Sequence, residues 1–164
     1  MKQQYYLSSL NIFLCTIIVV VASMSHSDDD KPKVIVQACS NTPNPDQCFH
    51  YIKADPRSNT VKDVQDVGIL MARILQLKAK LARDKIYRMM SAAERPDLKV
   101  HKLKACLGSY NNILNVDVEV AIDAFKDGNP RMAEVGADTA SHGVSDCEES
   151  FNGESPITNF NTLI

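Results

Sequence analysis

Apolar residues recur every three or four positions over three long stretches of the chain, which predicts three long amphipathic helices. The first helix is expected to begin near Thr60 or Asp63 and to end before Pro96, which cannot continue a helix. Its buried seam is predicted from steps of three and four residues and continues into a Met-rich segment. The seam comprises Val67, Leu70, Ile74, Leu77 and Leu81, followed by Ile86, Met89 and Met90.

The second predicted helix begins at Asp97 and ends at Gly128, a residue suited to the left-handed conformation at a helix C-terminus. Asp117 interrupts its apolar stripe, and we expect it at the edge of the stripe with its carboxylate reaching solvent. The stripe itself comprises Leu103, Leu107, Tyr110, Leu114, Ala121 and Ala124, with Cys106 and Ile113 beside it.

The third predicted helix runs from about Pro130 to Phe151, and its seam is made of small side chains that permit close helix approach. These are Ala133, Ala137, Ala140 and Val144. After Asn152-Gly153, Ser155 is expected to cap a fourth helix with Pro156 in its first turn. Only "ITNFNTLI" is left for that helix, so we expect the fourth helix to be truncated.

Two shorter segments precede the long helices. "VIVQACSN" and "TPNPDQCFHYIKAD" each predict a short helix, and no stretch of the sequence shows strand alternation with hairpin turns. The predicted fold is therefore all-α. It is an antiparallel up-down-up-down four-helix bundle preceded by a short N-terminal helical hairpin, in one domain over residues 26–164.

Residues 1–25 are expected to form a secretory signal peptide. Lys2 is the only charged residue before Asp28, and the apolar run from Ile12 to Ala22 is followed by small residues. The run is short for a membrane span, which needs about 20 apolar residues. A signal anchor is the alternative. Cleavage after Ser23 or Ser25 both fit the pattern, and we take Ser25.

The mature chain would have 164 − 25 = 139 residues, with 17 basic and 20 acidic side chains and a net charge of 17 − 20 = −3. No basic patch stands out, which argues against a nucleic-acid partner. The mature chain carries no CxxC or similar metal-binding spacing, so we expect no metal and no cofactor.

The cysteines that remain after cleavage of Cys15 are Cys39, Cys48, Cys106 and Cys147. An even number in a secreted chain predicts disulfides, for which three pairings are possible. If the second and third helices are antiparallel around Gly128–Pro130, Cys106 and Cys147 lie roughly level, within about 8 Å along the axis. That pairing leaves Cys39 and Cys48 to form a local disulfide.

No arrangement of residues is specific to catalysis. The histidines are scattered, and none forms an i, i+4 pair or sits in a motif. The acidic residues Asp146, Glu148 and Glu149 are expected to be a solvated helix face rather than a glycosidase cleft. No GxSxG context is present. The chain is therefore not expected to be an enzyme, and no catalytic residue is assigned.

Several motifs occur in a specific order along the chain. They are "ACSNTPNPDQC", "ADPRS", "CLGSYNNIL", "AIDAFKDGNPRMAE", "DCEESF" and "SPIT". In this order they resemble the plant invertase and pectin methylesterase inhibitor family, from Val34 to the C-terminus. The resemblance implies an antiparallel four-helix bundle after a helical hairpin, with disulfides Cys39–Cys48 and Cys106–Cys147. It also implies a secreted protein that blocks acid invertases or pectin methylesterases without catalysis of its own.

The resemblance also assigns a contact site. Invertase inhibitors of this family carry a Pro-Lys-Phe motif that enters the sucrose site of the enzyme, and the matching residues here are Pro130, Arg131 and Met132. A cation on a Pro-led turn suits a pocket lined with carboxylates. Arg131 is also unfavourable for the dipole at a helix N-terminus, which favours a functional role over a purely structural one. Pro130 alone could be no more than a first-turn proline.

We therefore expect a secreted inhibitor that blocks the active-site cleft of a plant acid invertase (β-fructofuranosidase), in the apoplast or cell wall, with the vacuole possible. The expected partner is a protein, the expected state is monomeric, and no membrane contact is expected after signal cleavage. Inhibition of a pectin methylesterase is the alternative. A non-inhibitory secreted helical bundle, such as a storage, defence or small-ligand-binding protein, is the second alternative.

Overall fold

The computed structural model describes residues 33–93 and 98–157, which belong to a compact unit that spans Lys33–Ile164. The described residues are helical apart from turns and short connections, and they contain no β-strand. This confirms the all-α fold class. The predicted signal peptide lies outside the described residues and stays a prediction. In the described part of the chain, no helix combines the length and the apolar character that a bilayer crossing requires.

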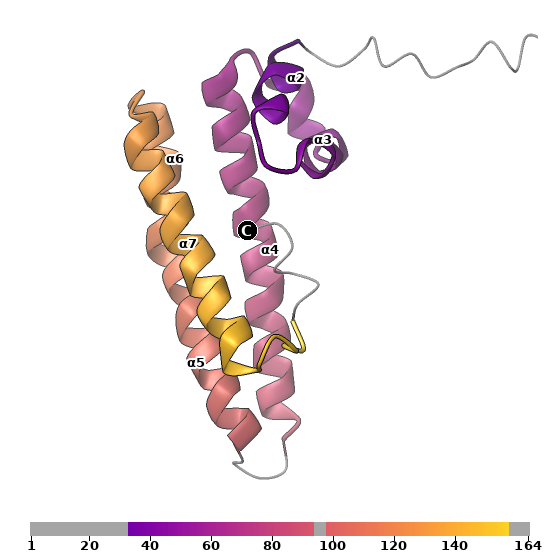
Figure 1. Cartoon of the computed structure of the whole chain (residues 1–164), viewed down its shortest axis with the longest axis vertical. Coiled ribbons are helices and arrows are strands. Elements are labelled where there is room, and N and C mark those ends of the chain that lie inside the picture. Colours follow the sequence, from indigo (N-terminus) through magenta and orange to yellow (C-terminus); the bar gives the residue numbers. More distant parts are fainter. Residues whose placement is uncertain (1–32, 94–97, 158–164) are drawn as a thin grey trace, which may run out of the picture. The chain divides into compact units, whose positions relative to one another are not determined.

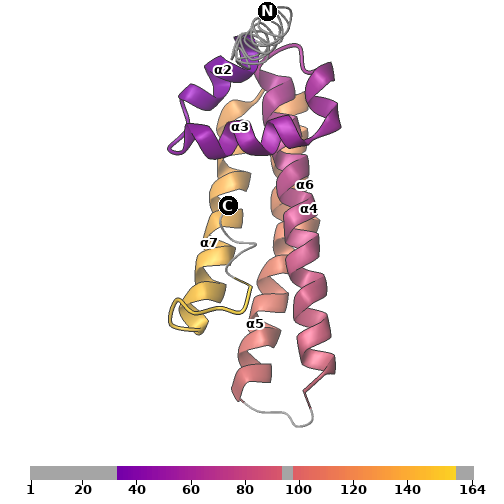
Figure 2. The same cartoon turned by 90° about the vertical axis from the view of Figure 1, so that its right-hand side faces the viewer.

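Three long helical arms pack side by side, and consecutive arms run antiparallel (Figures 1 and 2). The first arm is α4 (Val64–Ser91). The middle arm comprises α5 (Leu98–Asn112), the π-helical turn η3 (Ile113–Asp117) and α6 (Val118–Lys126). The third arm is α7 (Pro130–Ser150). Both α4 and α7 pack against the middle arm.

Helix α4 begins at the second of its two predicted starts. Asp63 is the N-cap, and its carboxylate accepts a hydrogen bond from the Asp66 N–H at 2.8 Å. Thr60 instead ends the 3₁₀ turn η2 (Pro56–Thr60).

The predicted seam of α4 is correct at Val67, Leu70 and Ile74 and again at Ile86, but it is wrong at Leu77 and Leu81. Leu77 and Leu81 are 54% and 44% exposed, whereas Ala79 and Ala82 are fully buried. The prediction advanced by 3.5 residues per turn, but a straight helix has 3.6, so the buried face drifts by about 20° per seven residues. The core therefore passes from the predicted leucines to the neighbouring alanines.

The middle arm was expected to be one regular α-helix, but it contains the π-helical turn η3. A π-turn accommodates an extra residue and shifts the phase of the buried face. As a result both Asp117 and Val118 point inside, with exposed fractions of 4% and 1%. The prediction that the Asp117 carboxylate reaches solvent was wrong.

Helix α7 uses Ala133, Ala140 and Val144 as predicted, but Ala137 is exposed and the buried position beside it is Gly136. A Cβ atom on Gly136 would lie 2.7 Å from the Asp117 carbonyl oxygen and 3.0 Å from the Ala121 nitrogen. Helix α7 therefore rests directly on the backbone of the middle arm at this point.

The N-terminal helices α2 (Lys33–Ser40) and α3 (Pro45–Ala54) pack against each other and against α4. They form a small core of their own with the first turns of α4. Its buried members are Ile35, Cys39, Cys48, Ile52, Val67, Leu70 and Ile74. The main core lies between the three arms and centres on Tyr110, Ile86 and Ile122.

The residues that the structure describes contain two disulfides. Cys39 and Cys48 join α2 to α3 with a Cα–Cα distance of 5.5 Å. Cys106 and Cys147 join α5 to α7 with a Cα–Cα distance of 4.8 Å, far from the turn that connects α6 to α7. The second disulfide therefore links the middle and third arms at their other end.

The start of the predicted fourth helix lies in a turn. The Ser155 hydroxyl accepts a hydrogen bond from the Ile157 N–H at 3.3 Å, and Ile157 is fully buried in the main core. Lys85 Nζ donates to the Pro156 carbonyl at 2.5 Å and so ties this turn to α4. The rest of the predicted helix, residues 158–164, lies outside the described residues.

The close approach at Gly136 can be tested by adding one methyl group. We expect Gly136→Ala to lower the free energy of unfolding by about 1–3 kcal/mol, because the backbone atoms it meets cannot move aside. The matched control is Gly143→Ala in the same helix, where the nearest atoms lie 3.5 Å away in a side chain. There the better helix propensity of alanine should raise stability by up to about 1 kcal/mol. Denaturant titration measures both, and equal stabilities would contradict the close approach.

Candidate functional site

The turn between α6 and α7 carries the predicted contact residues, and its backbone is fixed from the α6 side. Gly128 adopts a left-handed conformation with φ of 67°. The Asn129 N–H donates to the Ala124 carbonyl at 2.8 Å, and the Gly128 N–H donates to the Phe125 carbonyl at 3.1 Å. These two bonds form a Schellman motif, which satisfies carbonyl groups that the end of a helix leaves unpaired. Gly128 thus ends the helix as the sequence predicted.

The turn is also fixed from the α7 side. The side chain of Asn129 caps α7, since its Oδ1 accepts a hydrogen bond from the Met132 N–H at 3.1 Å. Pro130 occupies the first turn of the helix, where its fixed φ is already suitable. The contact residues therefore begin on a capped helix rather than on a free loop.

The predicted contact residues Pro130, Arg131 and Met132 are all exposed, and Met132 exposes 48% of its surface. Within the described part of the chain, Arg131 forms no ion pair, whereas the nearby Lys126 pairs with Asp123 at 2.8 Å. An exposed guanidinium beside an exposed apolar side chain can bind a carboxylate and an apolar surface at the same time.

The base of the turn is tied to the first arm. Gln65, in the first turn of α4, donates through Nε2 to the Lys126 carbonyl at 3.2 Å. The ring of Phe125 packs directly against Gly68 of α4. These contacts hold the end of α6 on α4, so the turn projects from a packed region.

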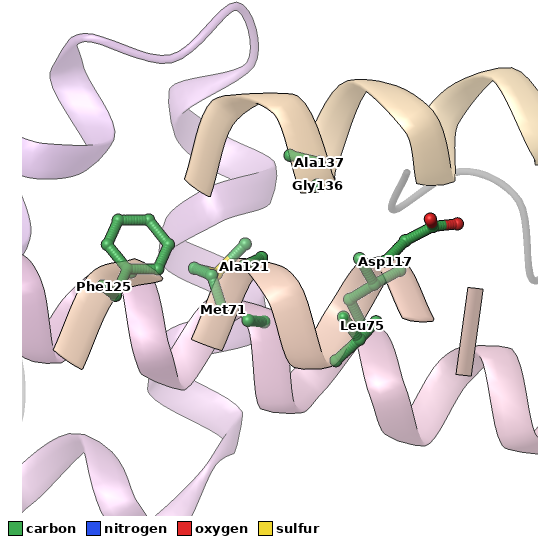
Figure 3. Close-up of a pocket in the computed structure, with 10 residues that line it drawn as sticks. Met71, Leu75, Asp117, Ala121, Phe125, Gly136 and Ala137 are labelled. Carbon is green, nitrogen blue, oxygen red and sulfur yellow. The ribbon is translucent and has the colours of Figure 1, made fainter. Parts of the chain in front are cut away.

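An apolar groove lies below the turn, with a volume of about 240 Å³ (Figure 3). Its walls come from α4, η3, α6 and α7, and Asp117 is its only ionisable lining residue. The other lining residues are Gly68, Met71, Ala72, Leu75, Val118, Ala121, Phe125, Gly136 and Ala137. Sequence reasoning missed this groove. An acidic residue inside an apolar stripe was the available signal, but it was interpreted as an edge position.

The Asp117 carboxylate has one side-chain partner in the described structure. Asn112 Nδ2 lies 3.3 and 3.4 Å from its two oxygens. Burial raises the pKa of Asp117, and the hydrogen bond from Asn112 offsets part of that rise. The two residues therefore form a buried polar pair beside the groove.

The other residues considered in the sequence do not form a catalytic constellation. Asp146 and Glu149 are exposed, and Glu148 is half-buried. Tyr110 is fully buried in the main core, and burial together with the charge of Glu148 raises the pKa of its hydroxyl. Among the residues that the structure describes, no three His, Cys, Asp or Glu side chains are placed to hold a metal ion.

The cap on α7 yields a test of how rigidly the turn is held. We expect Asn129→Ala to lower the free energy of unfolding by about 1 kcal/mol, because the Met132 N–H loses its partner. Asn129→Asp keeps the acceptor oxygen and should retain most of the stability. Denaturant titration compares the three proteins. An alanine variant as stable as the wild type would show that the cap does not stabilise α7.

Residues 33–164 match the family model described as "Plant invertase/pectin methylesterase inhibitor". The chain is 33% identical over 127 residues to the "Cell wall / vacuolar inhibitor of fructosidase 1" of Arabidopsis thaliana. That match covers 76% of this chain and 59% of the relative, so this chain spans less than two thirds of the length of that protein.

Two further similarities concern pectinesterase inhibitors. The "Pectinesterase inhibitor" of Actinidia deliciosa is 28% identical over 155 residues, which cover 93% of this chain and 82% of the relative. The crystal structure of a pectin methylesterase inhibitor from Arabidopsis thaliana matches with a TM-score of 0.53 at 14% identity. It covers 79% of this chain and 87% of that one. This last similarity concerns the fold alone.

Proposed function

Because the chain belongs to the plant invertase/pectin methylesterase inhibitor family, we propose that it inhibits a plant acid invertase by occluding the active-site cleft. The family consists of inhibitors rather than enzymes, and both relatives described above carry the word inhibitor in their names. The observation that carries the choice of target is the turn at Pro130–Met132. It presents a cation and an apolar side chain, both exposed, from a helix that is capped in place.

The proposed mechanism is steric and electrostatic. The Arg131 guanidinium would pair with carboxylates of the target cleft, and Met132 would fill apolar space beside them. The Schellman motif and the Asn129 cap fix the turn before binding, which lowers the entropic cost of association. Since arginine stays protonated at all relevant pH values, its attraction would follow the ionisation of the carboxylates on the enzyme.

Two observations support an invertase as the target. The fructosidase inhibitor of Arabidopsis thaliana is the more similar of the two relatives described above. Arg131 also keeps the positive charge that the resemblance assigns to this turn. The predicted signal peptide and the words "cell wall / vacuolar" in the name of that relative support secretion to the apoplast or delivery to the vacuole.

Inhibition of a pectin methylesterase is the second candidate. It is supported by the pectinesterase inhibitor of Actinidia deliciosa, of which this chain covers 82%. A side-by-side assay separates the candidates. The purified mature protein is mixed at micromolar concentration with an acid invertase or with a pectin methylesterase, and sucrose hydrolysis or methanol release from pectin is followed. Unchanged sucrose hydrolysis at acidic pH would refute the proposed target, and reduced methanol release would support the alternative.

The same assay can also show that the protein inhibits neither enzyme. A protein that is helical by circular dichroism but inhibits neither enzyme would be a non-inhibitory bundle. Circular dichroism on the same sample therefore accompanies each assay, so that loss of fold is not mistaken for loss of inhibition.

The role of Arg131 can be tested by reversing its charge. We expect Arg131→Glu to raise the inhibition constant at least tenfold, since a hydrogen bond to a charged group contributes about 1.5–3 kcal/mol and repulsion adds to its loss. Arg131→Lys should keep part of the inhibition, because it retains the charge but loses the planar fork. Inhibition constants from sucrose hydrolysis at acidic pH measure both.

The matched control is Arg88→Glu. Arg88 is exposed in the last turn of α4, at the opposite end of the arms from the α6–α7 turn, and its reversal changes the net charge equally (Figure 1). It should leave inhibition unchanged. If Arg131→Glu inhibits as well as Arg88→Glu, the turn is not part of the inhibitory contact.

A further inference from the structure

Asp117 is an ionisable side chain buried where three helical arms meet. It is 4% exposed and lies at the end of η3, beside the apolar groove. Figure 3 shows its carboxylate on the side of η3 that faces α7, away from Phe125 at the other end of the groove. The groove walls around it offer methyl and methylene groups rather than water. A carboxylate in such surroundings loses much of its hydration when it ionises.

Helix α7 is the element that encloses Asp117. The Asp117 carbonyl oxygen would lie 2.7 Å from a Cβ atom on Gly136, which places the two backbones in direct contact. No other residue type than glycine fits between them without a shift. At this point water cannot enter between α7 and the backbone of η3 unless the two helices separate.

The hydrogen bonding of Asp117 is too sparse to replace water. Asn112 Nδ2 approaches its oxygens at 3.3 and 3.4 Å, whereas charge-assisted bonds to a carboxylate are about 2.7–2.9 Å long. A single amide can serve the neutral acid well, because the acid needs fewer partners. The same amide leaves most acceptor sites of the ionised form unsatisfied.

No positive charge compensates for the ionised form. Among the described residues Asp117 forms no ion pair, and Arg73 of α4 lies 3.7 Å from Glu119. The charged and titratable residues on the elements packed against η3 include Arg73, Lys78 and Lys80 on α4, Lys104 on α5, Glu119 and Asp123 on α6, and Glu134, Asp138 and His142 on α7. The Lys78 ammonium lies over the Tyr51 ring of α3. Most of those on α6 and α7 are acidic, so they disfavour a further negative charge.

We propose that Asp117 is an acid-dependent latch that holds the first half of α7 against the middle arm when it is neutral and releases it when it is ionised. The neutral carboxyl fits between η3 and α7 with Asn112 as its partner. The ionised form gains hydration when α7 opens. Because α7 begins at Pro130, the latch also sets how rigidly the exposed turn is held. The latch concerns the free protein and does not rest on the proposed target.

The direction of the pH effect follows from the pKa of Asp117, which burial raises above its ordinary value of 3.8. At pH values below the unfolded pKa, both states bind the proton and the group costs no stability. As the pH rises toward the folded pKa, the unfolded chain releases its proton first and gains stability relative to the folded state. Acidic solution therefore favours the closed arrangement, and neutral solution weakens it.

The latch is tested by comparing the wild type with Asp117→Asn over a series of pH values from acidic to neutral. The variant keeps the shape and a neutral group but cannot ionise. The ratio of the unfolding constants, wild type over variant, should rise about tenfold for each pH unit that separates the folded and unfolded pKa values. Asp123→Asn is the matched control, because its exposed carboxylate lies on the same arm and pairs with Lys126. A ratio that does not change with pH would overturn the proposal.

Native-state hydrogen exchange shows which helix loosens when Asp117 ionises. The exchange rates of backbone amides 133–140, taken as a ratio of wild type to Asp117→Asn at each pH, should increase from acidic to neutral solution. Amides of α3 should keep a constant ratio. If the variant does not fold, ¹³C-detected titration of the Asp117 carboxyl in the wild type decides instead. A midpoint at or below 3.8 would overturn the latch.

Discussion

The contact between α7 and the backbone of the middle arm at Gly136 is the constraint on which the rest of the structure depends. It brings two helices closer than any side chain would allow, and it does so beside the buried Asp117. At one end of this contact the Cys106–Cys147 disulfide joins the two arms. At the other end the Schellman motif and the Asn129 cap join them through a short turn. The turn can therefore project Arg131 and Met132 from a helix that is joined to the middle arm at both ends.

The sequence predicted the elements well because the features that define them are local. Gly128 ends α6, Asp63 and Asn129 cap the following helices, and apolar residues repeat at helical spacing. These signals depend on the neighbouring few residues, so no knowledge of packing is needed. The family resemblance added a function for the turn, which no local pattern could have supplied.

The wrong predictions share a physical origin, because each concerns which side of a helix is turned toward the core. Leu77 and Leu81 turned outward because a regular repeat drifts along a long helix. Asp117 turned inward because the π-turn inserts a residue, and nothing in the local sequence marks that insertion. Gly136 rather than Ala137 is buried, because the backbones of α7 and the middle arm meet at Gly136. The groove and its buried carboxyl follow from these shifts, and the only signal for them in the sequence was an acidic residue inside an apolar stripe.

The Cys106–Cys147 disulfide and the exposed α6–α7 turn join the middle arm and α7 at opposite ends. The disulfide and the turn therefore make the middle arm and α7 into a covalently closed loop. A protease that cuts the exposed segment between Lys126 and Met132 would leave both fragments attached to each other. The cut protein would keep its mass, apart from one added water, and much of its packed core, while the new chain ends would no longer hold Arg131 in place. Under oxidising conditions, a cut in the turn would therefore free Arg131 from its fixed position while the disulfide keeps the two fragments together.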